Sequence, residues 1–177
     1  FVTSPTGNVP VFGKFYRQME ALLKKAADEI ETASPLVPDR HRLTFDAEAS
    51  AIRWFYHTAR TEANFYESCQ LRDQLLAFAS QGTKKPDDIT KAFKIYDRWR
   101  EVLLDERANA AEALPVMEAD MRLDFYYGGD HTFPHGTDMI QAKLRILDQE
   151  INEFLPALAQ RCGFIPHVGV KQTQSKR

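Results

Sequence analysis

The sequence has little of what marks several specialised protein classes. It contains two cysteines, Cys69 and Cys162, in 177 residues, which is too few for a disulfide scaffold. No window approaches the run of about 18 apolar residues that a membrane helix needs. The net charge is only -2, so no strong attraction to nucleic acid or to an anionic membrane is expected. These absences predict one soluble globular domain that binds neither partner.

Sequence motifs for catalysis are also missing. The chain has no glycine-rich phosphate loop, no Gly-x-Ser-x-Gly elbow and no Cys-x-x-Cys pair. The Glu-x-x-His motif of di-iron bundles does not occur either. Cys69 lies in an aromatic and Leu-rich stretch and Cys162 at the end of an expected helix, so both are expected to be packing residues. We therefore predict no catalytic residue, no cofactor and no metal ligand with a recognised spacing.

The 44% of hydrophobic residues recur mostly at spacings of three and four, which is the pattern of amphipathic helices. No stretch alternates as a half-buried strand would. The spacing predicts four helices, at residues 11–33, 44–82, 86–114 and 137–161. Four long helices with short connections predict an all-α, antiparallel bundle that forms a single domain over residues 1–177.

Helix ends are expected where proline, glycine and capping residues lie. Thr44 is the expected N-cap of the second helix, and Gly82 its expected stop. Pro115 is expected to break or kink the third helix, because proline cannot donate a backbone hydrogen bond. Gly163 is expected to close the fourth. The outer segments, 1–11 and 164–177, predict a linker and a flexible tail.

The start of the chain bears on its origin. Phe1 is not an initiator methionine, and the residues after it lack the basic and then apolar layout of a signal peptide. We therefore expect the chain to be part of a longer polypeptide.

An irregular segment rich in acidic and aromatic residues precedes the last helix, between Glu118 and His135. Its acids and imidazoles could bind a metal or another ligand, and its tyrosines could stack on a sugar. The alternative is structural: the polar residues cap or pair with helices, paired glycines turn the chain, and the aromatics cover one end of the bundle. The candidate ligand-binding residues are Asp120, Arg122, Asp124, Tyr126, Tyr127, Asp130, His131 and His135.

A second polar group lies on one face of the expected 44–82 helix, at spacings of three and four. Arginine and asparagine donate to hydroxyl and carboxylate oxygens, so this stripe could line a groove for a carbohydrate or an anion. A charged helical stripe is more often the solvated face. The stripe consists of Arg53, His57, Arg60, Asn64 and Glu67.

The order of these features resembles the helical C-terminal region of large bacterial proteins related to α-glucuronidases and other polysaccharide-degrading glycoside hydrolases. The likeness spans residues 11 to 162, and its main motif is Glu118-Ala119-Asp120-Met121-Arg122-Leu123, followed by a closing helix with Lys143 and Arg145 near its start. The chain departs from the motif at Asp124, where the related phrase often has glycine.

The resemblance implies a non-catalytic accessory domain that buttresses or borders a catalytic domain. Its partners would be the preceding catalytic domain of the same polypeptide, or carbohydrate, and its location would be secreted or periplasmic. No catalytic residue of the family maps onto this sequence. Two alternatives remain open, namely a free-standing ligand- or metal-binding bundle that uses residues Asp120 to His135, and a bundle that docks onto a partner protein.

Overall fold

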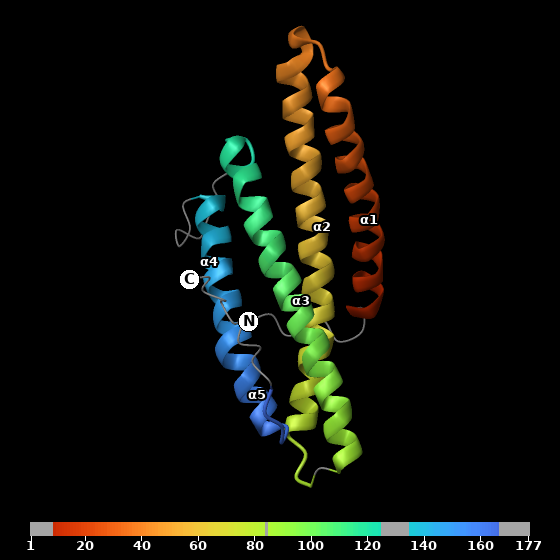
Figure 1. Cartoon of the computed structure of the whole chain (residues 1–177), viewed down its shortest axis with the longest axis vertical. Helices are drawn as coiled ribbons and strands as arrows, with labels where there is room; N and C mark the ends of the chain where they lie inside the picture. Colours follow the sequence, from red (N-terminus) through yellow and green to blue (C-terminus); the bar gives the residue numbers. More distant parts are fainter. Residues whose placement is uncertain (1–8, 84, 125–134, 167–177) are drawn as a thin grey trace, which may run out of the picture.

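The computed structural model describes residues 9–83, 85–124 and 135–166, and all of its regular structure there is helical. The fold is an antiparallel helical bundle, as the sequence predicts (Figure 1). Its elements are α1 (Val9–Ala33), the short 3-10 turn η1 (Ser34–Leu36), α2 (Asp39–Ala79), α3 (Pro86–Ala119), α4 (Gly136–Gln149), the π-helical turn η2 (Glu150–Phe154) and α5 (Leu155–Arg161).

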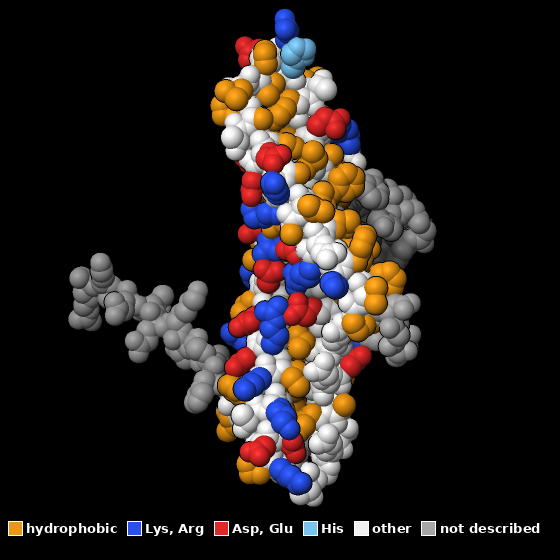
Figure 2. All heavy atoms as spheres, turned by 90° about the vertical axis from the view of Figure 1, so that its right-hand side faces the viewer, with side chains coloured by type: hydrophobic (Ala, Val, Ile, Leu, Met, Phe, Trp, Pro, Cys, Tyr) orange, Lys and Arg blue, Asp and Glu red, His pale blue; other side chains and the backbone are white. Residues whose placement is uncertain are grey.

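The helices lie side by side in chain order. The main contacts of α1 are with α2, those of α2 are with α1 and α3, and α3 packs against α4. The hairpin of α1 and α2 projects beyond the ends of α3 and α4 (Figure 1). Because α1 has one principal neighbour, its outer face carries exposed apolar side chains among acidic and basic ones (Figure 2).

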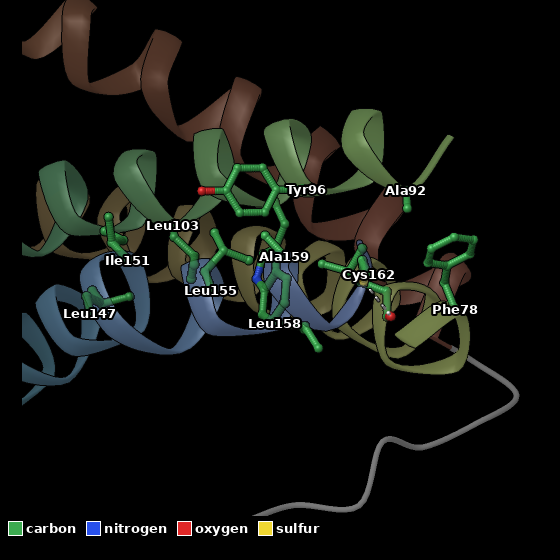
Figure 3. Close-up of a cluster of buried hydrophobic side chains, with 12 residues drawn as sticks. Phe78, Ala92, Tyr96, Leu103, Leu147, Ile151, Leu155, Leu158, Ala159 and Cys162 are labelled. Atoms are coloured by element: carbon green, nitrogen blue, oxygen red, sulfur yellow. Dashed lines mark hydrogen bonds between the residues drawn. The ribbon is translucent and has the colours of Figure 1, made fainter. Parts of the chain in front are cut away.

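The main core lies where α2, α3, η2 and α5 meet (Figure 3). Large apolar side chains fill it, and Leu75 and Leu155 are fully buried. Both cysteines are buried and neither forms a disulfide bond, as expected of packing residues. The indole N–H of Trp99 is the one buried side-chain nitrogen or oxygen without a hydrogen-bond partner in the described part of the chain. The other buried members are Phe78, Ala92, Tyr96, Leu103, Leu147, Ile151, Leu158, Ala159 and Cys162.

Several predicted helix ends are wrong by a turn or more. The second helix begins at Asp39, whose acidic side chain favours a first turn, and not at Thr44. It ends at Ala79, so Gly82 is not its cap. The third helix passes through Pro115 and ends at Ala119. The proline ring is exposed, while Ala113 and Met117 on either side of it are buried and hold the helix in place.

The last helix contains a feature that the spacing does not predict. The amide of Leu155 donates to the carbonyl of Glu150, which is the hydrogen bond of a π turn. The spacing of three and four from Leu147 and Ile151 predicts that Phe154 is buried. The additional residue moves the buried face by one position, so Leu155 is buried instead and Phe154 is 41% exposed. The turn lies directly before Pro156, which has no amide hydrogen to donate.

The predicted chain ends are partly wrong. The first helix begins at Val9, so only residues 1–8 of the expected linker lie outside it, and these are outside the described residues. Gly163 closes the last helix as expected, with φ of 90°. The amide of Phe164 then donates to the carbonyl of Ala159, and its ring packs edge-on against Tyr96. Phe164 is therefore not part of a flexible tail, and residues 167–177 are not described.

Candidate functional site

A cavity of about 500 Å³ lies between α2, α3 and α4, at the end of the bundle away from the main core. Its size is within the range of small-molecule sites. Most of its wall is apolar, and four polar or charged side chains lie on it, those of His57, Thr58, Thr61 and Lys143. The rest of the lining is Trp54, Ala110, Ala113, Met117, Leu123, Gly136, Met139 and Ile140.

Small residues make room for this cavity. Ala110 and Ala113 face it from α3, where Leu103 fills the equivalent space in the main core. At Gly136 a Cβ atom would lie 2.7 Å from Sδ of Met117. Because that distance is shorter than real Cβ contacts allow, any side chain at position 136 would require the flexible end of Met117 to move.

The polar wall of the cavity is a connected hydrogen-bond network between α2, α3 and α4. The Nδ2 group of Asn109 donates to the backbone carbonyl of His57 at 3.0 Å and to Oγ1 of Thr61 at 2.9 Å. Thr61 in turn donates to Oε1 of Glu106 at 2.8 Å and accepts from Nζ of Lys143 at 3.0 Å. Lys143 and Glu106 also form a close ion pair.

This network determines the tautomer of His57. Both amide hydrogens of Asn109 are used in donation, so its Oδ1, 2.8 Å from Nδ1 of His57, must be an acceptor. Nδ1 therefore carries the hydrogen, and the lone pair of the neutral ring is on Nε2. The described residues provide no hydrogen-bond partner for Nε2. Nε2 is also not among the fully buried side-chain atoms that lack a hydrogen-bond partner. Because His57 lines the cavity, we place this lone pair at the cavity surface.

Burial keeps the ring neutral. His57 is 8% exposed, and loss of water around it lowers the pKa of His57 below its ordinary value, an effect that the hydrogen bond to Asn109 only partly offsets. Glu112 and Glu106 act in the same direction as that bond, and Arg60 acts against it. A neutral imidazole with a free Nε2 can accept a hydrogen bond from a ligand.

A second set of contacts supports this wall from behind. Asn64 is 1% exposed and donates to Asp105 and Glu106, each at 2.8 Å. Its Oδ1 accepts from Arg17 of α1 at 2.6 Å. Burial would raise the pKa of Asp105, but hydrogen bonds from Arg60 and Asn64 outweigh it and lower that pKa. The carboxylate of Glu106 thus accepts a hydrogen bond from Asn64 at one oxygen and from Thr61 at the other.

The stripe Arg53, His57, Arg60, Asn64 and Glu67 is therefore not a solvated face. His57 and Asn64 are buried against α3. Arg60 pairs with Asp105 at 2.6 Å, and the side chain of Arg60 is only 14% exposed. The stripe faces neighbouring helices because α2 lies between α1 and α3, an arrangement that the sequence of α2 alone does not contain.

The described residues of the Asp120 to His135 segment make contacts within the protein. Asp120 accepts from Arg122 at 2.8 Å, and Arg122 also donates to the carbonyl of Ala47 on α2 at 3.0 Å. Asp124 accepts from the amide of Thr137 at 3.1 Å, which caps the start of α4.

His135 lies 3.5 Å from Asp124 and is exposed. Asp120, Arg122, Asp124 and His135 thus make the contacts that the structural alternative predicts, in which polar residues cap or pair with helices. Ligand binding by this segment stays a prediction, and Tyr126, Tyr127, Asp130 and His131 lie outside the described residues.

Two further observations limit what the site can be. Among residues 9–83, 85–124 and 135–166, no group of three His, Cys, Asp or Glu side chains is placed to hold a metal ion. Within the same residues, no helix combines the length and the apolar character needed to span a bilayer.

Sequence reasoning missed Glu106 and Asn109. Both occupy buried positions on the apolar face of α3, between Leu103 and Ala113. A polar residue at a position that the helical spacing assigns to the core is the signal that could have found them, because buried polar groups need partners. Lys143 enters the sequence argument only as a residue near the start of the closing helix.

No family model, curated protein or solved structure matches this chain.

Proposed function

We propose that this chain is a non-catalytic helical domain that binds a small organic ligand in the cavity between α2, α3 and α4. The observation that carries the proposal is Nε2 of His57, which has no hydrogen-bond partner among the described residues and lies on a mostly apolar wall that also carries Lys143. A few convergent polar groups in a largely apolar hollow are the usual form of a ligand site. The hydrogen-bond network holds those groups in place before a ligand arrives, which lowers the entropic cost of binding.

The methionines of the chain provide a direct test. Met117 and Met139 line the cavity, whereas Met19 and Met121 do not. A chain labelled with carbon-13 in its methionine methyl groups can be screened by NMR against small aromatic and aliphatic compounds. The proposal predicts compounds that shift the signals of Met117 and Met139 and leave those of Met19 and Met121 unchanged. Four unshifted signals throughout the screen would contradict it.

A cavity-filling variant sharpens this test. Ala113→Leu places a larger side chain in the cavity, whereas Ala111→Leu changes an exposed position of the same helix. We expect the first variant to lose binding and the second to bind as the unmodified chain does. Equal binding by a folded Ala113→Leu variant would place the ligand elsewhere.

We also propose that the domain accompanies the catalytic part of a carbohydrate-active protein. This proposal rests on the resemblance carried by Glu118 to Leu123, and two observations support it. Asp120 and Arg122 of that motif are used in contacts within the domain, as a non-catalytic role requires. The outer face of α1 carries Val11, Phe15 and Leu22, which are 66%, 54% and 71% exposed, and a face of this kind can pack against another domain.

The gene tests this second proposal. The coding sequence upstream of Phe1 is expected to encode a glycoside-hydrolase-like domain in the same reading frame. Phe15→Lys and Leu22→Lys are expected to weaken binding of the purified chain to that domain, and Met121→Lys, an exposed change away from α1, is expected not to. A start codon directly upstream with no enzyme domain before it would contradict the proposal.

A further inference from the structure

We infer that the ligand of this cavity is a neutral molecule with an apolar body and one hydroxyl group, and that this hydroxyl donates to Nε2 of His57 and accepts from Nζ of Lys143. The inference rests on the proposed function, since it specifies the class of ligand for the same cavity. Three features of the wall support it: the unpartnered acceptor Nε2 of His57, the remaining donor of Lys143, and the pairing of the Lys143 charge with Glu106.

The free acceptor is Nε2 of His57. Asn109 fixes the hydrogen on Nδ1, as described above, so Nε2 can only accept while the ring is neutral. A ligand must bring a donor to this atom. If a ligand displaced water from the cavity and left Nε2 unpaired, the complex would lose a hydrogen bond. A molecule with carbonyl or ether oxygens alone cannot supply that donor.

The free donor is the ammonium group of Lys143. It has three N–H bonds, of which two are directed to Thr61 and Glu106. No described residue accepts the third. The side chain of Lys143 is 33% exposed and lines the cavity. Thr61 lies about one helical turn after His57 on α2, so Lys143 meets α2 one turn along from His57, on the same cavity wall.

The charges of the wall cancel. Among the described residues, Lys143 is the only Lys, Arg, Asp or Glu in the lining, and the carboxylate of Glu106 is in direct contact with it. An anionic ligand would gain from Lys143 but would meet Glu106 directly behind it, and a cationic ligand would meet Lys143 first. Neither recovers the cost of leaving water. A hydroxyl group, which donates and accepts at once without charge, matches both free groups.

The remainder of the wall sets the apolar body of the ligand. Trp54 offers an aromatic surface, and Met117 and Met139 offer flexible side chains that adapt to the shape of a ring. Leu123 and Ile140 complete this apolar lining. A phenol or a cyclic alcohol carries this combination in one molecule.

Three probes of similar size separate the possibilities: 4-ethylphenol, its methyl ether 4-ethylanisole, and 4-ethylbenzoate anion. Each is titrated into the methionine-labelled chain near neutral pH, and the methyl signals of Met117 and Met139 report binding. We expect 4-ethylphenol to bind about tenfold more tightly than 4-ethylanisole, because the ether cannot donate to Nε2 and one hydrogen bond is worth roughly that factor. We expect 4-ethylbenzoate to bind more weakly than the phenol.

Each other outcome overturns a different statement. If the phenol and the ether bind equally at Met117 and Met139, the hydroxyl inference is wrong and the cavity is still a binding site. If the benzoate binds most tightly, the charge of Lys143 dominates and a neutral ligand is excluded. If none of the probes shifts these methyl groups up to millimolar concentration, while other compounds of the screen do, the ligand class is wrong. If no compound shifts them, the proposed function itself fails.

A pair of variants assigns the preference to His57. His57→Asn keeps a donor to Asn109 at the position of Nδ1 but has no atom at the position of Nε2, whereas His57→Gln keeps a polar group at that position. We expect the tenfold preference for phenol over ether to disappear in the asparagine variant and to persist in part in the glutamine variant. Because the preference is a ratio measured within one protein, a general loss of affinity does not imitate this result. An unchanged ratio in the asparagine variant contradicts the role of Nε2.

Discussion

The two ends of the bundle differ in what fills the space between the same helices. At one end, Leu75, Tyr96 and Leu155 belong to an apolar core whose tyrosine hydroxyl and tryptophan indole N–H are its polar groups. At the other end, the buried apolar cluster combines Ala110 and Ala113 with larger side chains, and Asn109, Glu106 and His57 are also buried there. The first arrangement removes apolar surface from water. The second leaves a cavity and uses hydrogen bonds to keep its wall in place.

This difference separates stability from binding within one domain. Tight packing stabilises the fold because filled volume contributes dispersion and transfer free energy. A cavity gives up part of that free energy, and buried polar groups contribute little net stability even when they are paired. We conclude that the main core carries most of the folding free energy, and the proposed ligand site lies at the end that contributes less.

The largest expected effect is in the main core. Leu155→Ala removes a fully buried side chain and should lower the free energy of unfolding by about 2 to 5 kcal/mol. The matched change Phe154→Ala, at the neighbouring exposed position, should cost much less. Denaturant titration measures both values. If Phe154→Ala were the more damaging, the π turn would not shift the buried face as described.

A smaller loss is expected in the polar network. Asn109→Ala removes the acceptor of His57 and two donated hydrogen bonds from a residue with 0% exposure. We expect a loss of about 1 to 3 kcal/mol in the free energy of unfolding. Asn152→Ala, which removes an exposed hydrogen bond to the carbonyl of Asp148, serves as the control in the same titration. Equal effects of the two changes would show that the network contributes nothing special.

The pH dependence of stability should also differ between the ends. The pKa of His57 is lowered in the folded protein. As pH falls below the ordinary histidine pKa of about 6.5, the unfolded chain therefore binds more protons than the folded protein does. The contribution of His57 to stability is therefore complete above that pH and is lost as pH falls toward the folded pKa. His57→Asn should flatten this part of the curve, and Leu155→Ala should only lower it. An unchanged slope in His57→Asn would show that His57 is not buried in its neutral form.

The smallest effect is expected at the surface. Arg107 and Asp148 pair at 2.6 Å between α3 and α4, with both side chains close to half exposed. Exposed pairs of this kind are screened by salt and contribute little. Arg107→Gln should leave the thermal midpoint within the scatter of repeated measurements at moderate salt. A clear decrease would mean that surface charge, and not the core, holds α4 on α3.

The helices could be predicted because their signal is local. The spacing of apolar residues in α1 and α4, and glycine at position 163, depend only on neighbours in the sequence. The passage of α3 through Pro115 and the π turn before Pro156 could not be predicted in this way, because packing on the far side of each helix decides whether the proline is tolerated. Sequence spacing therefore gave the architecture but not the register of the last helix.

Sequence reasoning pointed to another segment than the cavity for a related reason. Asp120 and Asp124 attracted attention because chemically active residue types cluster there in the sequence. The polar network of the cavity instead joins α2, α3 and α4: the contact of His57 with Asn109 spans 52 residues, and that of Thr61 with Lys143 spans 82. Only the pairing of the helices brings them together. The one local signal was the presence of polar residues within the apolar face of α3.

The protonation state of His57 tests the central claim most directly, because recognition in this account depends on a free lone pair on Nε2. A long-range proton–nitrogen-15 spectrum of the histidine rings, with His57 identified by its loss in His57→Asn, reports which nitrogen carries the hydrogen. We predict a neutral ring near pH 7 with its hydrogen on Nδ1 and an unprotonated Nε2 whose signal shifts when 4-ethylphenol is added. A hydrogen on Nε2, or a fully protonated ring at that pH, would contradict the account.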